Sequence, residues 1–527
     1  MSQEMASQSP PPPHPPALSN IPSEIIYMIF GFLASDKRTL SSLALVNSTC
    51  RQFARTYQFK NLHIKGGPIG SDELGILKTI QREASSAIVS PIGNCVRRLQ
   101  LGSVGELDKM FIEDEDWDSP PRWYYWPTAL RSLGNLRYWP TALRVVPTLQ
   151  NLRCLCIKGH WRELEVRLVD CLRQLSLREL NLMVQFTEQP RNLPRPYLCP
   201  QNTLKILRIE TIFDLQYTAF ERFDLSDFYR AILAPYSSYV RELSLSHIET
   251  LREPMGRQPR LRLFDVDFPK LEKLTIGPTI RMDAQLLPCL LREGLTSLSL
   301  VSNYEGTSQM LSKLGRIRTL KKLNLRDDRG HPGLYPPPID FIEANTQIQT
   351  IAVMKCNNAF ITKLTKSLRN HESLTFLWLR WNCGEPSTEA LENLSRLASI
   401  KTLCIDAEDI DTRGEGVESW ASHHARLRPY LARLPCLNRL FFTNDYIMYI
   451  HYNFRYIIKI LEDRFIKDEK ILNDCAFAYF KDLPALESLN FHHTTFSAEE
   501  INGVRQPRKD EFQGVEGFDG NEVMLRP

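Results

Sequence analysis

Most of this chain is built on one recurring pattern, in which apolar residues occupy the first, fourth and sixth positions of a short segment. Between Leu271 and Ile400 the starts lie 24, 25, 28, 26 and 26 residues apart. A chain with such a period builds its core by stacking similar units, so its length does not imply several separate globular domains. The clearest starts are Val96, Leu152, Leu177, Leu204, Val240, Leu271, Leu295, Leu320, Ile348, Leu374, Ile400, Leu437 and Leu486.

Each repeat is expected to supply one short strand and one covering segment. Side chains alternate between the two faces of a strand, so the leucines turn inward and the residues between them face outward. Residues 308–319, 358–371 and 387–399 have the apolar spacing of helices that cover the inner face. The period is in the range of leucine-rich repeats. The predicted fold class is therefore α/β, a leucine-rich-repeat solenoid forming a horseshoe with a parallel sheet.

Residues 18–60 carry a different apolar pattern, at the three- and four-residue spacing of helices. Pro22 suits a first helical position, where its missing N–H group costs nothing. Residues 35–36 interrupt the spacing. We expect three short helices here. The apolar positions are Ile25, Ile26, Ile29, Phe30, Leu33, Leu40, Leu43, Val46, Cys50 and Phe53.

The chain divides by pattern into five segments. The two ends are a disordered, Pro-rich leader and a flexible polar tail, because neither has the apolar periodicity of a packed element. The repeats are irregular within residues 113–144, which hold an acidic and aromatic duplicated insert of unknown role, and within residues 455–482, which we expect to be a long helix. The predicted segments are the leader 1–17, the helical domain 18–60, a connecting segment 61–94, the solenoid 95–495 and the tail 496–527.

Composition argues against two kinds of partner. Lys and Arg number 65 and Asp and Glu 61, which gives a net charge of +4 and no strong basic excess for nucleic acid. No stretch is long and apolar enough to span a membrane, and no secretory signal opens the chain. The 12 cysteines form no spaced framework. We therefore expect no nucleic-acid and no membrane partner, and a reducing compartment, cytoplasmic or nuclear.

The sequence predicts no catalytic residue, no metal site and no cofactor. Cys154 and Cys156 share the outward face of a strand, but no second pair lies nearby with zinc-ligand spacing. The doublets at 423–424 and 492–493 are histidines, and we expect them to be solvated rather than ligands. No phosphate loop, nucleophile elbow or H-E-x-x-H motif is present. A thiol or metal enzyme on a repeat scaffold stays a third hypothesis, tested by metal analysis and labelling of these two cysteines.

A protein target is expected on the outward strand face, the concave side of a horseshoe. Exposed aromatic and arginine side chains have the composition of a binding hot spot. Two alternatives stand beside this prediction: long loops or the C-terminal tail cover the aromatic residues, and the basic residues are only a solvated charged face. The candidate target-binding residues are Lys322, Arg326, Phe376, Trp378, Arg380 and Phe441.

The N-terminal residues resemble the F-box, chiefly the form common in fungal proteins. The resemblance covers residues 18–60 and is carried by Ile21-Pro22-Ser23-Glu24-Ile25-Ile26, Ile29-Phe30-Gly31-Phe32-Leu33 and the segment Leu40 to Phe53. Ile21 stands where the family usually has Leu, and Phe53 where many members have Trp. In the family, this region contacts the Skp-type adaptor of cullin–RING ligases. The resemblance implies adaptor contacts, or the core beneath them, at Pro22, Ile25, Ile29, Leu33, Leu40, Leu43 and Val46.

Together these features predict an F-box protein with leucine-rich repeats, not an enzyme. It would be the substrate-recognition subunit of an SCF-type ubiquitin ligase, with partners in the Skp-type adaptor, through it a cullin, and an unknown protein substrate. The alternative is a leucine-rich-repeat interaction scaffold not linked to ubiquitination. The N-terminal helices would then simply cap the solenoid, although their apolar residues occupy too wide an arc for one buried face.

Overall fold

The protein is described from a computed structural model. The structure describes residues 21–510 except 35, 65–70, 87–91, 103–137, 187–202, 214–224, 250–259, 262–265, 278–280, 283–289, 291–292, 302–310, 312–313, 327–337, 357, 382–386, 408–415, 444–468, 492–493 and 502. It forms two compact units: residues 1–102 with 133–156, and residues 103–132 with 157–527. The leader, the acidic and aromatic insert up to Arg137 and the first part of the predicted 455–482 helix lie outside the described residues.

Every predicted repeat start is followed, two residues later, by the first residue of a strand. The start residues themselves are buried, between 0% and 4% exposed. Their side chains therefore fill the core just ahead of each strand. The strands are β2 (Arg98–Leu101), β3 (Cys154–His160), β4 (Glu179–Phe186), β5 (Ile206–Phe213), β6 (Glu242–Glu249), β8 (Lys273–Ile276), β10 (Ser297–Val301), β11 (Lys322–Arg326), β12 (Thr350–Cys356), β13 (Phe376–Trp381), β14 (Thr402–Ala407), β15 (Arg439–Thr443) and β16 (Ser488–Phe491).

These strands belong to a sheet of 16 strands that follows chain order, with β1 (Asn61–Ile64) at one edge and β18 at the other. From β4 to β16 the neighbouring strands pair in parallel, Leu298 for example lying beside Leu323. The β12–β13 pairing shifts its register between Val353 and Cys356. Leucines at equivalent repeat positions therefore stack on one another. This arrangement is a parallel α/β solenoid, consistent with leucine-rich repeats.

A main-chain hydrogen-bond ladder runs just ahead of the strands. The carbonyl oxygen of Lys321 accepts from the N–H groups of Gln349 and Thr350, at 2.8 and 3.0 Å. The Gln349 carbonyl oxygen in turn accepts from Thr375 and Phe376. The same two-to-one pattern recurs in neighbouring repeats. It satisfies main-chain groups at the bend into each strand, which would otherwise be buried without partners.

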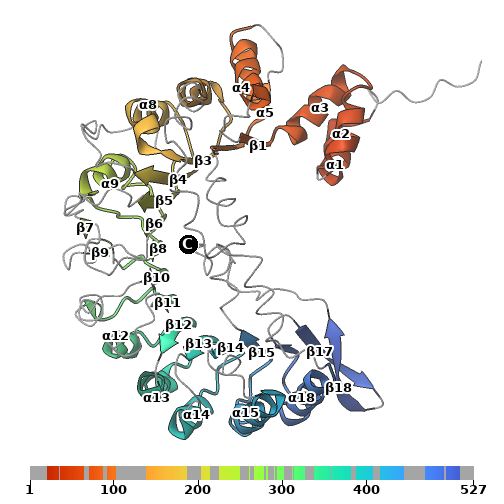
Figure 1. The fold of residues 1–527 in the computed structure, drawn as a ribbon, viewed down its shortest axis with the longest axis vertical. Coiled ribbons are helices and arrows are strands. Elements are labelled where there is room, and N and C mark those ends of the chain that lie inside the picture. Colours follow the sequence, from red (N-terminus) through yellow and green to blue (C-terminus); the bar gives the residue numbers. More distant parts are fainter. Residues whose placement is uncertain are drawn as a thin grey trace, which may run out of the picture. The chain divides into compact units, whose positions relative to one another are not determined.

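Helices cover one face of the sheet in the second unit, as Figure 1 shows for α12 to α15. The predicted helix 358–371 is α13 followed by a 3₁₀ turn, and the predicted helix 387–399 is the shorter α14. Of the predicted helix 308–319, residues 311 and 314 are helical, residues 315–319 are not, and residues 308–310 and 312–313 lie outside the described residues. The helices are α8 (Trp161–Arg173), α9 (Ser226–Leu233), α12 (Ile339–Ala344), α13 (Asn358–Ser367), η4 (Leu368–Asn370), α14 (Thr388–Leu394), α15 (Gly416–Leu431) and α18 (Glu469–Asp482).

The first unit begins with three short helices where three were expected. Pro22 is the residue before α1, and its carbonyl oxygen accepts from Ile25 and Ile26. We call α1 to α3 the helical module. The segment expected only to connect it to the repeats is itself structured, and its β1 begins the sheet. The unit contains α1 (Ser23–Phe32), α2 (Lys37–Leu43), α3 (Ser48–Gln58), α4 (Ser71–Ala84), α5 (Ile92–Cys95) and η3 (Val146–Thr148).

The expected flexible tail from residue 496 is ordered through Asp510. Strands β17 (Thr494–Ile501) and β18 (Val504–Asp510) form a hairpin, and β17 pairs antiparallel with β16. Gly503 lies at the turn with a positive φ of 75°, a conformation that glycine adopts without strain. Covering the edge of β16 with a hairpin removes a row of unpaired main-chain groups. A second, two-stranded sheet pairs β7 (Arg260–Leu261) with β9 (Arg281–Met282).

Candidate interaction surfaces

The helical module has a small apolar core of its own. Ile26 and Phe30 of α1 pack against Leu40 of α2 and against Cys50 and Ala54 of α3, all at most 6% exposed. Residues four apart on α1 share one face of that helix, so these two side chains define its inner side. The remaining apolar residues of α1 must then lie on its other sides.

Local polar contacts set the ends and the packing of these helices. Asp36 caps α2 by accepting hydrogen bonds from the N–H groups of Arg38 and Thr39, both at 3.1 Å, and from the Thr39 hydroxyl. The Thr39 hydroxyl bond, with the main-chain bonds, lowers the pKa of Asp36. Asn47 caps α3 by accepting from Cys50 N–H at 2.7 Å. Short helices are only marginally stable alone, so these caps and the packing against the core together stabilise α2 and α3.

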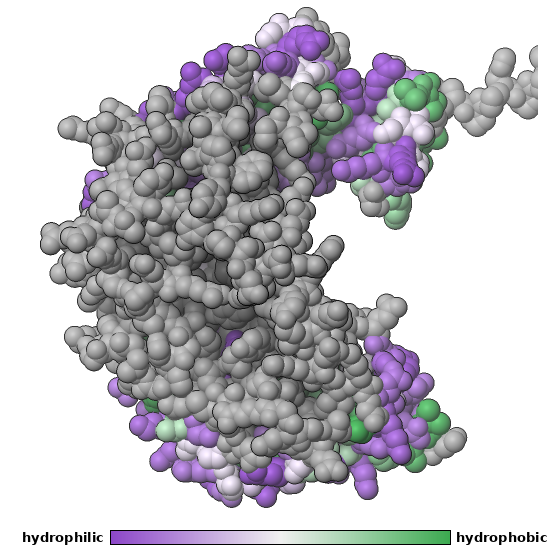
Figure 2. All heavy atoms as spheres, viewed as in Figure 1, coloured by the Kyte–Doolittle hydropathy of each residue, from purple (hydrophilic) through white to green (hydrophobic). Residues whose placement is uncertain are grey.

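The outer side of the module exposes a set of large apolar side chains. Phe32 is 87% exposed and Leu45 80% exposed, values unusual for single large apolar residues of a packed domain. Figure 2 shows hydrophobic atoms gathered on this module. Exposed apolar patches on a protein surface often mark a protein contact. We call this set the apolar face: Ile25, Tyr27, Met28, Ile29, Phe32, Leu45 and Val46.

The predicted adaptor-binding residues fall into three groups. Pro22, Ile25, Ile29 and Val46 are exposed, and Leu33 and Leu43 are half-buried against the core. Leu40 is 0% exposed, so it supports the surface from beneath and makes no direct contact. Sequence reasoning missed three members of the apolar face, Tyr27, Met28 and Leu45, and it counted Phe32 among the surplus apolar residues without naming it as an adaptor contact. For Met28 the signal was available in the helical spacing, since it lies on the side of α1 away from Ile26 and Phe30.

The outward face of the second unit differs from the predicted target site. Phe376, Trp378 and Phe441 are 8%, 4% and 5% exposed and form a buried cluster with Ala352 and Cys404. The parallel register places Trp378 beside Ala352 on one side and Cys404 on the other, so the side chains pack across strands. The prediction of an exposed aromatic hot spot is wrong, because these side chains are buried.

The three basic residues among the predicted target-binding residues also differ in exposure. Arg380 is 1% exposed, so it is a buried side chain and not a surface contact. Lys322 is half-buried at the start of β11. Arg326 ends the same strand, and its side chain lies outside the described residues. Of the six predicted target-binding residues, only Lys322 is described with an accessible side chain.

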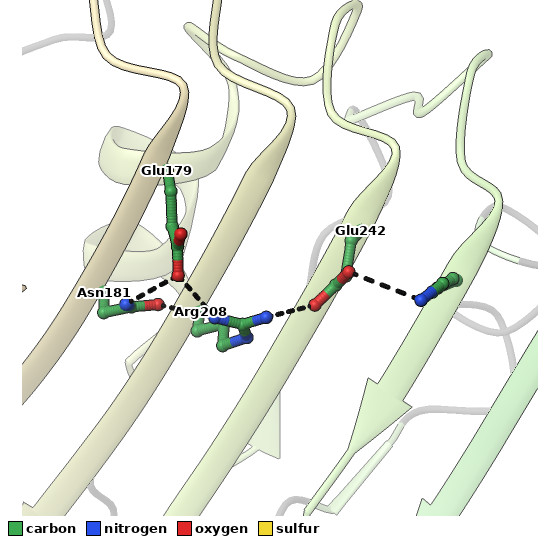
Figure 3. Close-up of polar contacts among 5 residues, drawn as sticks. Glu179, Asn181, Arg208 and Glu242 are labelled. Atoms are coloured by element: carbon green, nitrogen blue, oxygen red, sulfur yellow. Dashed lines mark hydrogen bonds and ion pairs between the residues drawn. The ribbon is translucent and has the colours of Figure 1, made fainter. Parts of the chain in front are cut away.

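A ladder of ion pairs crosses four neighbouring strands on the outward face (Figure 3). The Arg208 guanidinium on β5 donates to Glu179 of β4 at 2.7 Å and to Glu242 of β6 at 2.5 Å. Lys273 of β8 lies 3.8 Å from the Glu242 carboxylate. Asn181 donates to Glu179 at 3.1 Å. The planar guanidinium suits this bridge, because its two terminal nitrogens reach carboxylates on opposite sides.

Glu210 lies on the outward side of β5, two residues after Arg208. Its side chain is half-buried, and the buried oxygen Oε1 accepts no hydrogen bond. Burial raises the pKa of Glu210 to about 7, and Lys158 opposes that rise only partly. A carboxyl group in such surroundings changes charge near neutral pH.

Among the residues that the structure describes, the cysteines and histidines do not assemble into a metal site. Within the described ranges, Cys154 and Cys156 are half-buried and form no disulfide, and no three His, Cys, Asp or Glu side chains are placed to hold a metal ion. His423 and His424 were expected to be solvated, but they are 5% and 2% exposed. His424 packs among aromatic rings, and its Nδ1 lies 3.0 Å from the Tyr479 hydroxyl. The other histidine doublet lies outside the described residues.

The fold and these surfaces define a class: a parallel-strand repeat protein that carries a small helical module with an exposed apolar face. No protein-family model and no curated protein matches the chain. Among solved structures, a leucine-rich-repeat protein of Leptospira interrogans is similar to it, with a TM-score of 0.25 and 11% identity over 78% of this chain and 97% of that one. No helix in the described part of the chain has the length and hydrophobicity to cross a membrane.

Proposed function

We propose that this protein is a substrate receptor of an SCF-type ubiquitin ligase, in which the helical module binds a Skp-type adaptor and the repeats hold a protein target. The observation that carries the proposal is the apolar face of the module. Its residues belong to the segment that resembles the F-box, and the family contacts its adaptor through that segment. Ligase subunits bound through the adaptor would supply the chemistry, and this chain would supply proximity.

The energetics favour a protein occupant for the apolar face. Burying one large aliphatic or aromatic side chain releases about 1.5 to 3 kcal/mol. Phe32 and Met28, 87% and 55% exposed, would each recover part of that free energy in a groove. An amphipathic helix laid in an apolar groove is a common recognition mode, and α1 has the required side chains on successive turns.

The test is direct binding of the full-length chain to a purified Skp-type adaptor, measured by calorimetry. We expect the double variant Ile29→Asp with Phe32→Asp to weaken binding at least tenfold, because two carboxylates would be buried without partners. Phe477→Asp is the matched control, since Phe477 is also an exposed aromatic residue, 40% exposed on α18. Its affinity should equal that of the unaltered chain.

The alternative is a repeat scaffold that binds proteins without ubiquitination. If the unaltered chain does not bind the adaptor, the ligase assignment fails and the scaffold stands. If the adaptor binds but no cullin co-purifies with the complex, the scaffold is again favoured. The ion-pair ladder and Lys322 then become the first positions to alter in a search for the target, because they are accessible on the outward strand face.

A further inference from the structure

The helical module continues into the first strand of the sheet with almost no linker. Only Phe59 and Lys60 separate the end of α3 from β1 (Figure 1). The Lys60 carbonyl oxygen accepts hydrogen bonds from the N–H groups of Arg97 and Arg98, at 2.9 and 3.0 Å. The last residue before β1 is therefore already part of the ladder that joins the strands. A short, hydrogen-bonded connection leaves little freedom for the module to rotate.

One buried carboxylate joins three helices at this junction. Glu83 lies on α4 and is 9% exposed. Its Oε2 accepts a hydrogen bond of 2.6 Å from Ile92 N–H at the start of α5. Its Oε1 lies 4.0 Å from Nη1 of Arg55 on α3. A charged acceptor for an N–H group at a helix start is among the stronger hydrogen bonds in proteins.

The surroundings of Glu83 are tightly packed. The Thr56 side chain of α3 hydrogen-bonds the Cys95 thiol of α5, and burial raises the pKa of that thiol. A Cβ atom added at Gly93 would lie 3.3 Å from Leu149 Cδ2 and 3.5 Å from Ile80 Cγ2. The α5 turn is thus held from both sides, and it has little room to shift without breaking the Glu83 contact.

We propose that Glu83 is a positioning residue that holds the helical module and the first two strands as one rigid body. It does not touch the apolar face, so it sets the orientation of that face and not its affinity. For the ligase the inference rests on the proposed function, because the orientation of adaptor relative to the repeats matters only if the adaptor binds. The rigidity itself is a property of the chain alone.

The test measures the distance distribution between two spin labels in the full-length chain. Lys37→Cys on α2 and Arg98→Cys on β2 place the labels on exposed positions either side of the junction. Cys154, Cys156, Cys436 and Cys475 are first replaced by serine, because these thiols are partly or fully exposed. Cys199, Cys289, Cys356 and Cys383 are replaced as well, because their side chains lie outside the described residues. We expect a narrow distribution in this background and at least a doubling of its width in Glu83→Ala.

Glu83→Gln separates the hydrogen bond from the charge. Its amide oxygen can still accept from Ile92 N–H, and the 4.0 Å ion pair with the half-exposed Arg55 is weak. We therefore expect Glu83→Gln to restore the narrow distribution. If the alanine variant acted only by unfolding α4, Glu83→Gln would not restore it. Glu392→Ala, at an exposed position of α14, is the control and should change nothing.

The inference would be overturned by a broad distribution in the unaltered background, or by an equally narrow one in Glu83→Ala. A broad distribution in Glu83→Gln would also overturn it, since the hydrogen bond would then not hold the junction. Adaptor affinity of Glu83→Ala should stay within twofold of the unaltered chain. The spin-label measurement needs neither adaptor nor target, so failure of adaptor binding would reject the proposed function and leave the positioning role standing.

Discussion

The hydroxyl of Tyr57 on α3 donates a hydrogen bond of 2.9 Å to the main-chain carbonyl oxygen of Tyr27 on α1. The Tyr27 ring also meets the Phe53 ring edge-on, with 4.7 Å between centroids. The two contacts fasten α1 to α3 through the middle of α1. With that side anchored, Met28 and Phe32 remain turned to solvent.

Tyr57→Phe should loosen α1 without disturbing the core of the module. Loss of one solvent-accessible hydrogen bond costs about 0.5 to 1 kcal/mol, which corresponds to a roughly two- to fivefold loss of amide protection. Hydrogen exchange of the α1 amides measures it. Amides of the distant helix α14 should keep their protection, and unchanged exchange in α1 would show that the ring packing alone holds the helix.

Arg208→Met should destabilise the repeats by about 1 kcal/mol, because it leaves two carboxylates without their shared cation while the site stays partly hydrated. The Arg208 side chain is 39% exposed, which limits the effect. Denaturant midpoints in low and high salt measure it. The difference from the unaltered chain should shrink in high salt, whereas a salt-independent loss would point to packing of the arginine stem.

Glu210→Gln should stabilise the protein at high pH and not at low pH. The pKa of Glu210 is raised to about 7, so the unfolded chain gives up this proton at a lower pH than the folded chain does. Stability therefore falls as pH rises toward 7 and levels off above it. Because Glu210→Gln removes that loss of stability, it should raise the free energy of unfolding by at most about 3 kcal/mol near pH 8 and leave it unchanged near pH 4. Denaturant midpoints at both pH values measure it, and an equal gain at both would contradict the assignment.

Trp378→Ala should lower the free energy of unfolding, because Trp378 is a buried side chain and not an exposed one. The side chain is 4% exposed and packs in the outward cluster, so its removal costs about 3 to 5 kcal/mol. Thermal unfolding measures the loss. Lys322→Ala, at a half-buried position of the same face, is the control and should change stability little. A Trp378 variant as stable as the unaltered chain would mean that the cluster is open in solution.

The C-terminal hairpin should prevent the sheet from pairing with other molecules. A chain ending at His493 lacks β17 and β18 and leaves the edge of β16 open, which favours self-association. Light scattering measures this self-association. The matched control ends at Asp510 and retains both strands, so it should stay monodisperse. Equal scattering from the two chains would show that the hairpin does not protect this edge.

The repeat architecture could be predicted from the sequence, because each repeat is specified by residues that are close together in the chain. Each start residue, such as Leu271 or Leu374, is followed by a strand at the same offset, and alternation within a strand decides which side chains enter the core. The helices of the module were predictable for the same reason, since helical spacing is a property of a few consecutive residues.

Packing between segments far apart in the chain was decided only in three dimensions. The outward positions of Phe376 and Phe441 follow from alternation, but their burial depends on residues brought together across strands. His424 became a core residue because Tyr479, 55 residues later, lies beside it. Residues 494–510 have polar composition, yet they form strands because the open edge of β16 offers main-chain partners. Periodicity thus sets which way a side chain points, and tertiary contacts set whether anything covers it.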